Sequence, residues 1–217
     1  MLNYFFIVSF FAFWRILILS FTKFFDYNIS KNIAHFIHAL IFVIYYNTNF
    51  DKSYLINLST SFYIYDLIYI ILQLFQNKNA LISQGPFIVH HIIAIYGLYL
   101  SSIDISSNFI LMIYNILENS NFMLYVAYHV NKSYTTFPYY VYIVEFIQYI
   151  WYTYFRIIYF SRYLLSNLDE IYLHNEIISY TLLATLYFMG VFWSYKLFLK
   201  NIKNISLILE EIKPKSE

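Results

Sequence analysis

GPFIVHHIIAIYGLYLSS, residues 85–102, is an apolar stretch long enough to cross a membrane, with His90 and His91 adjacent near its middle. An ionisable side chain inside such a helix is costly unless it faces protein or water. Two adjacent histidines therefore do not belong on a surface that faces lipid. The stretch predicts a helix whose polar side turns toward the interior of a helical bundle.

The two histidines of this helix lie on different stripes, because consecutive helical residues point about 100° apart. Small residues share the stripe of His90, and they let a neighbouring helix or a long thin ligand come close; they are Ala94, Gly97 and Ser101. The stripe of His91 continues instead through Ile95 and Leu98. We therefore predict that His90 faces a polar interior, with His91 beside it.

The composition of the whole chain indicates an integral membrane protein. Of its 217 residues, 61% are hydrophobic and only 12% are charged, whereas soluble domains carry about 25% charged residues. A net charge of +1 gives no indication of a nucleic-acid partner. The absence of cysteine excludes disulfides, thiolate metal sites and a thiol nucleophile.

Apolar segments on both sides of the histidine helix predict an all-α protein with about seven membrane-spanning helices. Pro86 suits the first turn of the histidine helix. The seven predicted spans are residues 2–21, 32–46, 54–76, 86–102, 107–128, 139–159 and 176–199. The fifth segment is the least apolar, so it either spans as a helix packed inside the bundle or enters as a broken helix lining a cavity.

The positions of the basic residues favour seven spans over six. With the N-terminus outside, only Lys52 and Arg162 lie on the outer side, whereas most lysines lie on the inner side, as the positive-inside rule expects; these are Lys23, Lys31, Lys78, Lys132, Lys196, Lys200, Lys203, Lys213 and Lys215. Six spans with a re-entrant fifth segment would place basic loops on both sides.

Ionisable residues at membrane depth occur in each of the second to sixth spans. Asp66 shares a stripe of the third span with Ser59 and Tyr63, and Glu118 lies in the fifth span. Because buried charges in lipid pair or line water, we expect one shared, hydrated cavity; its other predicted members are His35, His38, His90, His91, Glu145 and Arg156. Interhelical hydrogen bonds that only fix packing are the simpler interpretation of any one of these residues alone.

Histidines in such a cavity act as a general base, a nucleophile or a metal ligand. In acyl transfer, a neutral imidazole takes a proton or the acyl group while Asp66 or Glu118 orients its other nitrogen. The pairs His35 with His38 and His90 with His91 do not form the HxxxH and HxxHH boxes of membrane di-iron enzymes. We therefore expect neither a metal nor another bound cofactor.

Four segments in order resemble the TLC domain family (TRAM, Lag1 and CLN8 homology), and most of all its small TLC domain-containing members. They are NIAHFIHALIFVIYY (32–46), SFYIYDLIYI (61–70), VHHIIAIYGLYL (89–100) and ILENSNFMLYV (116–126). The resemblance implies a first helix outside a six-helix TLC-type barrel around a lipid-accessible cavity. We therefore expect the first helix and linker over 1–30 and the barrel over 31–200, and the charge bias predicts a charged cytosolic tail over 201–217.

The resemblance implies a role in membrane-lipid metabolism, with His90, His91, Asp66 and Glu118 as the catalytic residues if the protein is an enzyme. One reading is a ceramide-synthase-like N-acyltransferase that uses acyl-CoA as co-substrate and a sphingoid or related lipid as acceptor. Ceramide synthases, however, carry a histidine and paired aspartates after the HH helix, where this chain has Asn115 and Glu118. The alternative is a non-enzymatic protein that binds or regulates membrane lipids. A channel or transporter is disfavoured, since no inverted repeat or paired helix break occurs.

The last five residues, KPKSE, resemble the KxKxx dilysine signal that returns membrane proteins to the endoplasmic reticulum. Such a signal is an address read by a receptor rather than an anchor. It requires a cytosolic terminus, which the charge bias also favours. We therefore expect a multi-pass protein of the endoplasmic reticulum.

Overall fold

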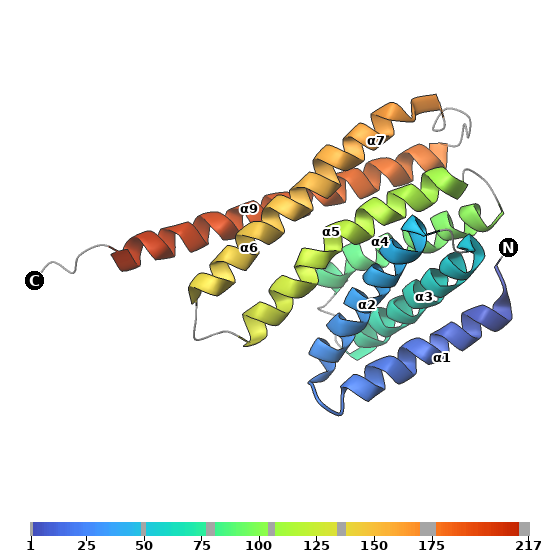
Figure 1. Cartoon of the computed structure of the whole chain (residues 1–217), viewed down its shortest axis with the longest axis horizontal. Helices are drawn as coiled ribbons and strands as arrows, with labels where there is room; N and C mark the ends of the chain where they lie inside the picture. Colours follow the sequence, from blue (N-terminus) through green and yellow to red (C-terminus); the bar gives the residue numbers. More distant parts are fainter. Residues whose placement is uncertain are drawn as a thin grey trace, which may run out of the picture.

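The computed structural model describes residues 2–48, 51–76, 81–103, 107–133, 138–169 and 177–212, and every regular element in these ranges is helical. The helices lie alongside one another in one bundle (Figure 1). Their bounds are α1 Tyr4–Phe21, α2 Tyr27–Asn47, α3 Lys52–Gln76, α4 Leu81–Ser102, α5 Ser107–Ser133, α6 Pro138–Thr153, the π-helix η2 Tyr154–Tyr159, α7 Phe160–Ser166 and α9 Ile177–Ile212. The predicted all-α membrane class agrees with this architecture.

Large apolar side chains cover the outside of the bundle. Phe5 on α1, Phe75 on α3 and Phe188 on α9 are 75%, 79% and 68% exposed. Four helical segments within the described ranges are long and apolar enough to cross a membrane: Tyr4–Phe21, Tyr27–Asn47, Lys52–Gln76 and Tyr180–Glu210. Seven spans stay a prediction.

Helix α1 lies at one side of the bundle and contacts α2 and α3 (Figure 1). Trp14 on α1 is fully buried, and its ring packs edge-on against Phe62 of α3. In the rest of the bundle, α2 contacts α3 and α5, α3 contacts α4, α5 contacts α6, and α9 contacts both α6 and α4. This order brings the polar faces of α2, α3, α4 and α5 together.

Two helices begin before the predicted residues for identifiable reasons. The predicted span 32–46 is short for a membrane helix and left open a start before Lys31, and α2 does begin earlier, at Tyr27, because the Asp26 side chain caps it by accepting a hydrogen bond from the amide of Ile29 at 2.9 Å. Helix α4 begins at Leu81, so Pro86 lies inside the helix rather than in its first turn. Proline at this position cannot donate to the carbonyl four residues earlier.

Three helices also differ from their predicted lengths or continuity. Helix α5 is uninterrupted from Ser107 to Ser133, so the broken-helix alternative for the fifth segment is wrong. The sixth span passes through the π-helical turn η2 and continues as α7 to Ser166, beyond its predicted end at residue 159. Helix α9 continues to Ile212 rather than ending near residue 199.

The small-residue stripe of α4 is where α5 comes close. The Tyr114 hydroxyl of α5 donates a hydrogen bond to the carbonyl oxygen of Ala94. A Cβ added at Gly97 would lie 2.8 Å from this hydroxyl oxygen. The stripe thus serves helix packing, with α5 as the neighbour that approaches α4.

Candidate functional site

Asp66 is the centre of a cluster of basic groups from three helices. It is 3% exposed on α3. Its Oδ1 lies 2.5 Å from the Lys31 Nζ and 3.4 Å from the His35 Nε2, both on α2, and its Oδ2 lies 2.9 Å from the His91 Nε2 on α4. One carboxylate therefore joins α2, α3 and α4 by charge-assisted contacts.

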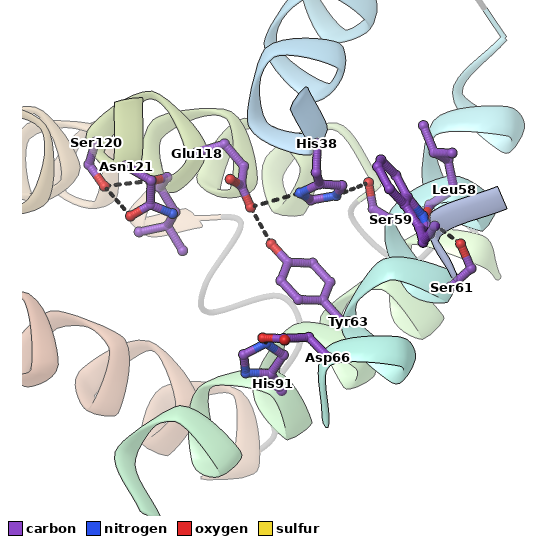
Figure 2. A network of polar contacts seen from close by, with 12 residues as sticks. His38, Leu58, Ser59, Ser61, Tyr63, Asp66, His91, Glu118, Ser120 and Asn121 are labelled. Atoms are coloured by element: carbon purple, nitrogen blue, oxygen red, sulfur yellow. Dashed lines mark hydrogen bonds and ion pairs between the residues drawn. The ribbon is translucent and has the colours of Figure 1, made fainter. Parts of the chain in front are cut away.

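Both ring nitrogens of His91 face hydrogen-bond acceptors. Its Nδ1 lies 2.6 Å from the Phe87 carbonyl oxygen one turn earlier, and its Nε2 faces Asp66 (Figure 2). Both nitrogens of His91 are therefore engaged, and its ring is held between the backbone of α4 and the Asp66 carboxylate.

Glu118 forms a second polar group beside this cluster. The Tyr63 hydroxyl donates a hydrogen bond to its Oε1, and the His38 Nδ1 lies 3.7 Å from the same oxygen (Figure 2). The other ring nitrogen of His38 lies 3.1 Å from the Ser59 Oγ. The face of α2 that carries His35 and His38 thus contacts Asp66 with one histidine and Glu118 with the other.

His90 lies next to the Asp66 cluster but outside its hydrogen bonds. Its ring centre lies 5.5 Å from that of His91 and 6.2 Å from that of Tyr63. Its Nδ1 is buried and has no hydrogen-bond partner among the described residues. His90 faces the polar interior as predicted, but its neighbour His91 is the histidine that pairs with the carboxylate.

Arg156 brings a buried positive charge to the same region from η2. It is 2% exposed. Its Nε donates to the Ser120 Oγ at 2.7 Å, and one terminal nitrogen donates to the Asn121 Oδ1 at 3.3 Å. The π-helical turn therefore connects the sixth span to α5 next to Glu118.

A cavity of about 290 Å³ lies between these groups. Its wall combines the polar residues with aromatic and aliphatic side chains, as in small-molecule sites. The lining residues are His35, Phe62, Tyr63, Asp66, Phe87, His90, His91, Glu118, Asn121, Leu124, Tyr125, Tyr152, Arg156, Trp193, Lys196 and Leu197. The four residues predicted to be catalytic, His90, His91, Asp66 and Glu118, thus share one cavity, and their catalytic role stays a prediction.

Glu145 does not belong to this cavity, so its predicted place there is wrong. It is buried on α6, where its carboxylate accepts hydrogen bonds from Asn131 of α5 and Asn204 of α9, both at 2.7 Å. The Lys200 Nζ lies 2.6 Å from its Oε1. Glu145 points toward α5 and α9 near their C-terminal parts, and it joins three helices there.

Several residues of the cavity wall and its surroundings were not predicted. Lys31 lies just before the predicted second span, 32–46, although Lys31 and His35 are four residues apart and share a helical face. That spacing could have identified Lys31. Trp193 and Lys196 of α9 gave no such signal, because the polar residues of the last span follow no clear stripe.

Two further predictions concern metal binding and the tail. No group of three or more His, Asp or Glu side chains that could hold a metal ion occurs in the described ranges; His174 is outside them. The dilysine residues Lys213 and Lys215 also lie outside the described residues.

In comparisons with known proteins, no family model, no curated protein and no solved structure matches the chain. The resemblance to the TLC family therefore depends on the four motifs of the sequence alone.

Proposed function

We propose that this chain is a TLC-type multi-pass membrane protein of lipid metabolism, and that it transfers an acyl group from acyl-CoA to the amine of a sphingoid or related lipid. The observation that carries the proposal is the His90 Nδ1, which has no hydrogen-bond partner among the described residues, beside the His91–Asp66 pair on a cavity wall. A ring nitrogen that is free to take a proton, next to a fixed histidine–carboxylate pair, is an arrangement suited to general-base catalysis.

In the proposed reaction, His90 takes the proton of the lipid amine. The amine nitrogen attacks the thioester carbonyl, a C–N bond forms, the C–S bond breaks, and the CoA thiolate leaves and takes the proton from His90. Because both nitrogens of His91 are engaged, His91 and Asp66 hold the wall and place charge next to His90. Glu118 with Tyr63 completes the polar side of the cavity.

The arrangement of helices supports the TLC-type barrel as part of the proposal. The contacts connect α2, α3, α4, α9, α6 and α5 into a ring around the cavity, and α1 lies outside that ring. The aromatic residues Phe87 of α4 and Trp193 of α9 lie with ring centres 5.3 Å apart at the cavity wall. An acyl chain would enter next to this pair, where α4 and α9 meet.

The alternative function is non-enzymatic lipid binding or regulation. The observation that favours it is that Asp66 and Arg156 are already held by neighbouring side chains. In this case the polar groups fix the helices around a lipid, and His90 is only a wall residue.

Mass spectrometry of reactions with purified protein distinguishes the two functions. Wild-type protein in detergent is incubated with acyl-CoA and a sphingoid base, and we expect N-acylated product. His90→Ala should lower the rate at least about 100-fold, the usual contribution of a general base. His129→Ala is the matched control, because His129 lies on α5 but does not line the cavity. Absence of product from wild-type protein with every acyl-CoA tested, with lipid still bound, supports the alternative.

We further propose that the protein resides in the endoplasmic reticulum through Lys213 and Lys215. Changing both lysines to serine should release the protein from reticular membranes, as seen by imaging in eukaryotic cells. Unchanged reticular staining would show that the tail is not the address. A C-terminal tag located in the lumen would overturn the seven-span topology.

A further inference from the structure

Arg156 differs from the other basic residues because it is fully inside the bundle. Within the described ranges, it is the only lysine or arginine classed as buried. Two neutral groups hold it, the Ser120 hydroxyl and the Asn121 side-chain amide, and its guanidinium carbon lies 5.4 Å from the ring centre of Tyr152. The guanidinium thus lines the cavity with its position fixed.

No carboxylate among the described residues lies within ion-pair distance of Arg156. The two lysines near buried acids are paired with them, Lys31 with Asp66 at 2.5 Å and Lys200 with Glu145 at 2.6 Å. Glu118 lines the same cavity, but its Oε1 is engaged by Tyr63 and its carboxylate forms no ion pair with the guanidinium. A guanidinium in this position is therefore a buried cation without a direct counter-ion.

A buried charge is costly unless an opposite charge compensates it. The planar donor fork of arginine suits carboxylate and phosphate groups. We propose that Arg156 binds the anionic head group, a carboxylate or a phosphate, of a single-chain amphiphile whose hydrocarbon chain fills the apolar part of the cavity. This proposal rests on the proposed function in one respect, that the cavity binds a lipid, and it does not require the acyl-transfer reaction.

Helix α9 fixes the position of Arg156 and brings a second cation to the cavity. Gly190 lets α9 pack closely against η2, since an added Cβ would lie 3.2 Å from the Arg156 Cβ. Lys196, about two turns further along α9, also lines the cavity, and its Nζ lies 4.5 Å from the ring centre of Phe192. A second cation at the cavity wall would attract an anion toward Arg156.

Binding of matched amphiphiles to the purified protein tests the proposal without any reaction. The probes are a sixteen-carbon fatty acid, a lysophosphatidic acid and the uncharged sixteen-carbon alcohol, each titrated against the protein in detergent. Wild-type protein should bind at least one anionic probe at least tenfold more tightly than the alcohol. A comparison of the affinities for the fatty acid and the lysophosphatidic acid shows whether the site prefers a carboxylate or a phosphate.

In Arg156→Gln, the preference for the anionic probe should fall to within twofold, while the affinity for the alcohol stays unchanged. Lys200→Gln, which removes a cation paired outside the cavity, should keep the preference. If Arg156→Gln does not fold, the wild-type comparison decides, together with Asn121→Ala, which loosens one contact of the guanidinium and should reduce the preference.

Equal wild-type affinity for acid, phosphate and alcohol would overturn the proposal. A preference for anionic probes that survives in Arg156→Gln would also overturn it, and so would a preference that is lost only in Lys196→Gln. If no acyl transfer is found but the preference for anionic probes is intact, the proposed reaction is rejected and the anion site at Arg156 stands. If acyl transfer is found but the preference is absent, only the anion site is rejected.

Discussion

Asp66 and Glu145 lie in different parts of the bundle, and each is 3% exposed. Each carboxylate contacts a lysine and joins three helices. Asp66 contacts three basic side chains and lines the central cavity, whereas Glu145 is held mainly by two asparagines and one lysine and is not among the cavity-lining residues. A buried acid in a membrane helix is therefore not by itself evidence of a functional site. The adjoining cavity, and the His90 Nδ1 that has no hydrogen-bond partner among the described residues, distinguish the surroundings of Asp66 from those of Glu145.

The largest expected difference concerns the two carboxylates themselves. Asp66→Asn should lower the free energy of unfolding by about 3 kcal/mol, because the cluster keeps its basic groups and loses the charge that compensates them. Glu145→Gln should cost about 1 kcal/mol, since the two asparagines can still hydrogen-bond an amide. Denaturant titration in mixed micelles with tryptophan fluorescence measures both. Equal losses would show that the Asp66 cluster is no more than a structural joint.

The adjacent histidines His90 and His91 should contribute unequally to the stability of the fold. His91→Ala should lower the free energy of unfolding by about 2 kcal/mol, because it removes a hydrogen bond to a buried charged group. His90→Ala should cost about 1 kcal/mol, the typical loss for a substitution that removes packing without a hydrogen bond. The same micelle titration measures this pair. A larger loss for His90→Ala would contradict the assignment of His91 as the paired histidine.

The two glycines of α4 test how closely α4 packs against α5. Gly97→Ala should cost about 1–3 kcal/mol, because the new methyl group would displace the Tyr114 hydroxyl from its bond to Ala94. Gly85→Ala is the matched control. No atom lies within 4 Å of a Cβ at Gly85, so alanine there should be neutral or slightly stabilising. Thermal denaturation of the two variants compares them, and identical midpoints would mean that α4 and α5 separate easily.

The smallest expected effect is that of Lys200 in the Glu145 cluster. Lys200→Gln should change the free energy of unfolding by about 0–1 kcal/mol, because its side chain is 48% exposed and solvent screens the pair. Lys31→Gln should cost more, since the Lys31 side chain is only 20% exposed and faces Asp66. Thermal denaturation in detergent compares the two. A larger effect at Lys200 would reverse the ranking of the two clusters.

The sequence by itself determined the all-helical class, the membrane environment and most helix positions. These follow from local properties: apolar length, helical periodicity and the distribution of charged residues. It also identified His90, His91, Asp66 and Glu118 as cavity residues, because ionisable groups within apolar helices turn inward. Helix ends that depend on single side chains were less predictable, such as the start of α2 at the Asp26 cap and the passage through Pro86.

Only the tertiary structure decided which polar groups meet. The pairing of His91 rather than His90 with Asp66 depends on how α4 is rotated against α3, and a stripe of one helix does not specify that rotation. The exclusion of Glu145 from the cavity, the entry of Trp193 and Lys196 into its wall, and the contact of Lys31 with Asp66 follow from which helices become neighbours. Contacts between helices far apart in the chain depend on packing of the whole bundle, and local sequence patterns carry little information about it.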